Sequence, residues 1–277
     1  MSTTAERTQQ LEDLRNEIRT VRARIVDLVA RMEDIRLQQI PQIQADYALK
    51  IGCWEQALLE AELAARRSRR RLALAQAQVN QGHAPQMDAI ELQLDAELAE
   101  WTIKIEQARE SFERKLAYIT GSTSMTKEQA AKLRKLYRLL VKRLHPDVCL
   151  NKDEYSEMLF QIARVAYHNG DLQTLESLEV ATRHYDPAAD DLSAFSDMAA
   201  LAQELELAQI EEGVMRERLA ELEQGEEMQL AKLLADPDWV TKRTMELRLA
   251  VEKWEQVRDE CDERLRVMKE AFNEHRD

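Results

Sequence analysis

Residues 11–35 read LEDLRNEIRTVRARIVDLVARMEDI, and the apolar positions in this stretch recur at alternating intervals of three and four. This spacing returns each side chain to one stripe of an α-helix, as in the seam of a coiled coil. The stretch therefore predicts a long helix that pairs with another helix, and it indicates an all-α fold. The stripe consists of Leu11, Leu14, Ile18, Val21, Ile25, Leu28, Met32 and Ile35.

The composition of the whole chain agrees with this prediction. Its 277 residues include only six glycines and five prolines, where an ordinary globular chain of this length has roughly three times as many. Sheets and nucleotide-binding folds need turns rich in these residues. The composition therefore excludes most enzyme folds.

Glycines and prolines that end or kink helices divide the chain into separate helices. Pro41 predicts a kink, because proline cannot donate a backbone N–H. A helix is expected over 42–79, a turn at 80–85 and a second helix over 86–119. In the last third, helices over 190–234 and 237–277 are expected on either side of a turn at 235–238. Since short turns join antiparallel neighbours, we expect long antiparallel coiled-coil arms at 1–120 and 186–277 that flank a smaller unit at 121–185.

The unit at 121–185 is the place where the charge of the chain reverses. The net charge of the chain is −13, yet residues 126–147 contain seven basic and two acidic side chains. Thr126 and Gln129 have the spacing of a capping box, which predicts a helix from Lys127. Its apolar face carries Leu133, Tyr137, Leu140 and Leu144, and its other faces carry Lys135, Arg138, Lys142 and Arg143.

This helix is expected to end at His145-Pro146-Asp147, because the residue before a proline is disfavoured in helical conformation. The sequence of 137–147, YRLLVKRLHPD, resembles the second helix and following loop of a J domain of the DnaJ type. Residues 160–167, FQIARVAY, resemble the third helix of that domain. The resemblance covers about residues 126–180.

The resemblance implies co-chaperone action rather than an enzyme, with no catalytic residue and no cofactor in the chain itself. J domains dock on a DnaK-type chaperone and stimulate its ATPase. By this resemblance the basic side chains contact an acidic patch on the chaperone, and the Asp147 carboxylate accepts a hydrogen bond from a cationic side chain of the chaperone. The residues expected to bind the chaperone are His145, Pro146, Asp147, Tyr137, Arg138, Lys142, Arg143 and Lys135. The arms are expected to bind an unidentified client or partner.

Three alternatives stay open. The chain could be a structural coiled-coil scaffold with a J-like unit that does not stimulate a chaperone, and its seams could close within one chain or in a homodimer. The basic run at 66–71 could bind nucleic acid, which we consider the weaker hypothesis, or it could pair with the acidic C-terminal arm.

The remaining features of the sequence point to a reduced, cytoplasmic protein. Three scattered cysteines favour free thiols over disulfides. The histidines lack companions at metal-ligand spacing, so we expect no metal site. No apolar run reaches the roughly 18–20 residues of a membrane span, and the N-terminus lacks an apolar signal segment.

Overall fold

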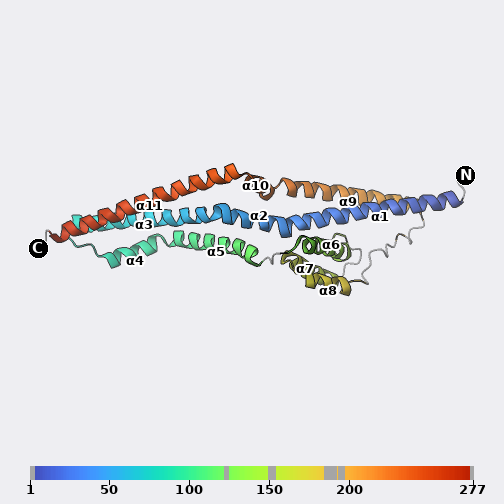
Figure 1. Cartoon of the computed structure of the whole chain (residues 1–277), viewed down its shortest axis with the longest axis horizontal. Coiled ribbons are helices and arrows are strands. Elements are labelled where there is room, and N and C mark those ends of the chain that lie inside the picture. The colour runs from blue at the N-terminus through green and yellow to red at the C-terminus, as the bar shows by residue number, and fades with distance from the viewer. Residues whose placement is uncertain (1–3, 122–124, 149–153, 184–191, 193–196, 275–277) are drawn as a thin grey trace. The chain divides into compact units, whose positions relative to one another are not determined.

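The computed structural model of the chain describes residues 4–121, 125–148, 154–183, 192 and 197–274 (Figure 1). Helices make up the regular structure of these residues, which confirms the prediction of an all-α fold. The elements are α1 (Thr4–Asp34), the π-helical segment η1 (Ile35–Gln39), α2 (Ile40–Tyr47), the π-helical segment η2 (Ala48–Gly52), α3 (Cys53–Asn80), α4 (Met87–Glu97), α5 (Ala99–Gly121), α6 (Lys127–Leu144), α7 (Glu154–His168), α8 (Leu172–Ala181), α9 (Met198–Gln224), α10 (Glu226–Leu234) and α11 (Pro237–Glu274).

Most helix ends coincide with the breakers in the sequence. Gly82 and Gly170 follow α3 and α7 with φ of 79° and 69°, a conformation that glycine adopts without steric cost. Asp236 precedes α11, which begins at Pro237. At Pro41 the expected kink takes another form. The helix widens into η1 and continues as α2, because a π-helical turn absorbs the missing proline N–H without ending the helix.

The described residues form two units. The first combines Met1–Ile43 with Thr120–Leu230, and the second combines Gln44–Ile119 with Ala231–Asp277. This division differs from the three consecutive segments expected from the sequence, since each expected arm contributes to both units. The reason is that the long helices pair laterally with helices far away in the chain.

In the first unit, α1 lies along α9 (Figure 1). The heptad residues of α1 are its buried face, with Ile18 and Val21 fully buried. Arg22 donates to Glu204 at 2.7 Å, and Arg24 donates to Glu212 at 2.7 Å. The contacts advance in the same direction along both helices, so α1 and α9 are parallel.

The second unit pairs α3 with α11 in the same way (Figure 1). Arg243 of α11 donates to Glu55 of α3 at 3.4 Å, and further along the two helices Arg71 lies 3.5 Å from Asp262. This pairing is also parallel. Helix α9 thus packs on α1 in the first unit and α11 packs on α3 in the second, and the hairpin of 190–234 with 237–277 stays a prediction.

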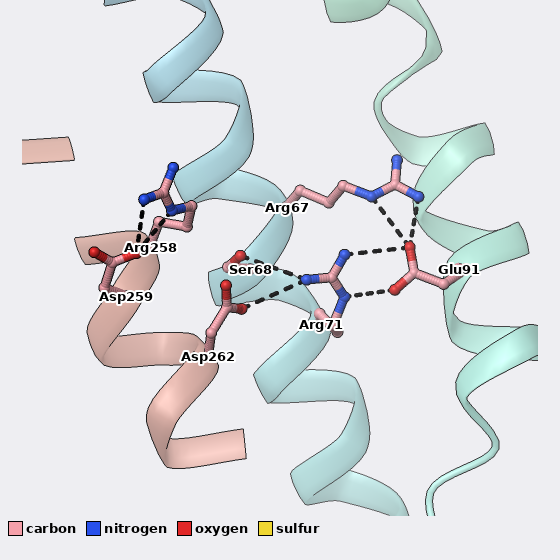
Figure 2. Close-up of polar contacts among 7 residues, drawn as sticks. All are labelled: Arg67, Ser68, Arg71, Glu91, Arg258, Asp259 and Asp262. Atoms are coloured by element: carbon pink, nitrogen blue, oxygen red, sulfur yellow. Dashed lines mark hydrogen bonds and ion pairs between the residues drawn. The ribbon is translucent and has the colours of Figure 1, made fainter. Parts of the chain in front are cut away.

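The basic run at 66–71 lies within α3 and is largely paired with acids (Figure 2). Arg71 donates to Glu91 of α4 and to Asp262 of α11, and Arg67 donates to the same Glu91. The guanidinium of Arg70 forms two bonds with Glu97 at 2.8 and 2.9 Å. The run thus joins three helices of its own unit, and only part of it pairs with the C-terminal arm.

Candidate functional site

The helix that carries the charge reversal begins as predicted. The backbone N–H of Gln129 donates to the Thr126 hydroxyl at 3.2 Å, and the Thr126 N–H donates to the Gln129 side chain at 2.9 Å. These two bonds satisfy donors that the first turn of a helix leaves unpaired. The helix ends at His145, whose φ of −66° and ψ of 131° are extended. Pro146 accounts for this conformation.

The apolar face of α6 packs on α7, α8 and α1. Tyr137 lies in this core, with its ring stacked on Tyr167 at a centroid distance of 4.0 Å. Its hydroxyl donates to Glu33 of α1 at 3.2 Å, and burial raises the pKa of that hydroxyl. Of the residues expected to bind a chaperone, Tyr137 is therefore placed inside the unit and positions α6.

The turn after α6 is held by its own histidine. The Asp147 N–H donates to Nδ1 of His145 at 3.0 Å, so the ring proton is on Nε2. The ring also lies edge-on against Phe160, with centroids 4.8 Å apart. Burial lowers the pKa of His145, which favours the neutral ring that this acceptor role requires. His145 is only 8% exposed, whereas the Asp147 side chain is exposed and Pro146 is half-buried.

A shallow pocket lies beside this turn. Its walls come from α1 and η1 on one side, from α9 on another and from the turn itself. The lining residues are Val29, Met32, Glu33, Arg36, His145, Asp147 and Arg218. One side of the His145 ring therefore faces other helices of its own unit, and Asp147 marks the outer edge of the turn.

The four basic residues singled out from the sequence have different surroundings. Lys135 and Lys142, two turns apart, are exposed and form no ion pair with the described residues. Arg138 lies on the surface between them and pairs with Asp27 of α1. Arg143 is mostly buried and donates to the Glu179 carbonyl at 3.0 Å and to Thr182 at 3.3 Å. Lys135, Arg138 and Lys142 are thus available at the surface, while Arg143 fastens α6 to α8.

Two residues important for this unit were missed by the sequence analysis. Glu33 is buried in α1 and accepts from Nε of Arg164 in α7 at 2.9 Å, in addition to Tyr137. The sequence contained a signal for this pair, because Arg164 is the single arginine or lysine in α7. A buried carboxylate needs such a partner. This cluster attaches α7 to α1 directly behind His145.

Comparison of the chain with protein-family models, with curated proteins and with solved structures finds no match in any of the three. Within the described residues, no group of three or more potential ligand side chains is arranged for a metal ion. In the same part of the chain, no helix combines the length and hydropathy of a membrane span.

Proposed function

We propose that this protein is a J-domain-like co-chaperone, in which α6 and the turn at 145–147 dock on a DnaK-type chaperone and stimulate its ATPase. The observation that carries the proposal is the outer face of α6. That face presents Lys135, Arg138 and Lys142 and leads directly into a turn with an exposed carboxylate at Asp147. The resemblance over 126–180 supplies the class of partner.

The physical roles within the site differ. The exposed bases attract an acidic surface on the chaperone and accelerate the encounter, since charges at the rim of an interface act mainly on the rate of association. Asp147 accepts a charge-assisted hydrogen bond from a chaperone cation. His145 acts through Asp147: its Nδ1 accepts a hydrogen bond from the Asp147 backbone N–H and restrains the backbone that carries the carboxylate. We therefore regard His145 as a positioning residue.

The test is a single-turnover ATPase measurement with a DnaK-type chaperone and the full chain. We expect the wild type to raise the hydrolysis rate, Asp147→Asn and His145→Gln to abolish the increase, and Lys142→Gln to require more protein for the same effect. Lys127→Gln is the matched control, because Lys127 is exposed on the same helix and lies about 22 Å from Lys142 at 1.5 Å per residue. A folded wild type without stimulation would rule the proposal out.

The second candidate is a coiled-coil scaffold whose J-like unit serves as a packing module. It is favoured by the contacts of the unit with α1, where Asp27 pairs with Arg138 and Glu33 binds Tyr137 and Arg164. In a scaffold, His145→Gln leaves partner binding and cellular role intact, whereas polar replacement of the buried Ile18 or Leu247 disrupts assembly. The two candidates thus differ in their response to a single substitution in the turn.

A further inference from the structure

Helix α7 is apolar on two faces. Its inner face contributes Leu159, Phe160, Ala163, Ala166 and Tyr167 to the core of the unit. Its outer face carries a second apolar stripe at intervals of three, four and three residues, with 41–61% of each residue exposed. We call this set the α7 stripe; it consists of Tyr155, Met158, Ile162 and Val165.

The α7 stripe is unlike a scatter of single exposed apolar residues, which is normal on any surface. Four neighbours on one helix face form a continuous strip about 15 Å long, at a rise of 1.5 Å per residue. The stripe adjoins the buried face of α7, so the apolar surface of this helix is wider than the part that the core of the unit covers. Within the described residues nothing covers the stripe, and exposed contiguous apolar surface of this kind marks interaction sites.

The charges around the stripe are acidic. Glu154 and Glu157 adjoin Tyr155 and Met158, are exposed and form no ion pair with the described residues. From residue 154 to residue 181 the chain has five acids and one lysine or arginine, and that one, Arg164, is bound to Glu33. Helix α6 has seven bases and one acid. The J-like unit therefore separates its charges, with bases on α6 and acids on α7 and α8.

We infer that the α7 stripe docks a basic amphipathic helix of a partner protein. Such a helix places apolar residues at intervals of three and four into the stripe, with lysines or arginines along the margin to meet Glu154 and Glu157. A second copy of α7 is a poor occupant, because the one arginine or lysine of this helix, Arg164, is bound to Glu33 and leaves no cation on α7 to meet Glu154 and Glu157. The docking surface is separate from the basic face of α6, so both can be occupied at once.

The test uses the full chain and a labelled synthetic helix of 14 residues, with leucines at intervals of three and four and lysines beside them. Fluorescence anisotropy is expected to show saturable binding. Met158→Ser and Ile162→Ser should weaken it at least tenfold, and Glu154→Gln with Glu157→Gln severalfold, with a smaller dependence on salt. The matched control is Ile210→Ser, since Ile210 is also exposed, on α9, within the similar row Leu207, Ile210 and Val214.

Three results would overturn the inference. One is the absence of saturable binding by the basic peptide. Another is equal binding of a peptide in which glutamates replace the lysines, because the acidic margin would then select nothing. The third is a dimer in sedimentation that Ile162→Ser dissociates, which would identify a second copy as the occupant. Chaperone stimulation by Ile162→Ser is a separate readout and is expected to stay at the wild-type level, so failure here leaves the proposed function untouched.

Discussion

The imidazole Nδ1 of His168 lies 2.9 Å from the carbonyl oxygen of Leu37. Leu37 lies in η1, the π-helical segment just before Pro41, and Pro41 has no backbone N–H to donate to the carbonyls of this turn. Since a carbonyl can only accept, the Nδ1 of His168 carries the proton in this bond. Gln38 adds a bond from its side chain to the Tyr167 carbonyl. The end of α7 thus compensates the helix at the point where proline weakens it.

This compensation predicts a rescue experiment. His168→Leu removes the donor and is expected to cost about 1–3 kcal/mol in the free energy of unfolding of the first unit, the range for an unsatisfied buried group. Pro41→Ala restores a backbone N–H that can donate to the carbonyls of this turn. The double variant should therefore lose less stability than His168→Leu alone.

Hydrogen exchange of the backbone amides in α6 and α7 measures this loss of stability, because both helices belong to the first unit. All four tryptophans, Trp54, Trp101, Trp239 and Trp254, lie in the second unit, so their fluorescence should be unchanged and serves as the internal control. Equal losses in the single and double variants would show that the His168 bond does not substitute for the proline.

A second prediction concerns pH. Burial lowers the pKa of His145 below its ordinary value of 6.5, so below that pH the unfolded chain binds a proton that the folded ring does not. The stabilising contribution is complete above pH 6.5 and is lost as the pH falls toward the lowered pKa, with a slope of at most about 1.4 kcal/mol per pH unit.

Exchange protection of α6 and α7 should therefore decrease between pH 7 and 5 more steeply in the wild type than in His145→Gln, after correction for the intrinsic exchange rate. The two proteins are identical at every other histidine, so the comparison isolates His145. The carboxyl of Glu212, whose pKa is lowered from 4.5 by Arg24, affects stability only at lower pH. Parallel profiles for the two proteins would contradict the burial of a neutral His145.

The heptad spacing predicted the buried side of α1, and Ile18, Val21 and Ile35 are fully buried. It could not predict the partner of α1, because an apolar stripe specifies a surface and not the helix that covers it. The choice of α9 depends on ion pairs such as Arg24 with Glu212, which join residues 188 positions apart in the chain. Distant pairs of this kind leave no local pattern in one sequence.

The candidate site was predictable to a similar degree. Helical periodicity placed Tyr137 on the apolar side of α6, and that is where its ring lies. The capping box and the proline located both ends of the helix. The burial of Arg143 was not predictable, because its burial depends on acceptors from α8. The contact between α1 and the turn at 145–147 was not predictable either, because it depends on tertiary packing.

A third prediction tests how tightly α3 is packed in the second unit. Ala65 is fully buried in α3, so Ala65→Leu overpacks the unit and is expected to destabilise it by about 1–3 kcal/mol. The measurement is urea unfolding followed by tryptophan fluorescence. Ala73→Leu is the control, because Ala73 is exposed on the same helix and has the same change in side chain. Equal midpoints for the two variants would show that the interface has room for a larger residue.

The fourth prediction rests on the proposed function and concerns Asp27, which pairs with Arg138 across the surface. An acidic chaperone surface must compete with Asp27 for this guanidinium. Exposed pairs contribute about 0.2–1 kcal/mol, so Asp27→Asn should tighten chaperone binding about 1.5- to 5-fold. Lys142 forms no ion pair with the described residues, and Lys142→Gln should weaken binding instead.

Titration of the chaperone's ATPase stimulation, at low and high salt, provides the affinities. Glu17→Gln in α1 controls for the general gain of positive charge, since Glu17 is exposed and Arg138 does not pair with it. In the background of Arg138→Gln the Asp27→Asn substitution should have no further effect, because its only route to the chaperone is through that arginine. An equal gain in both backgrounds would mean that Asp27 acts through net charge, and that the pair does not restrain the docking face.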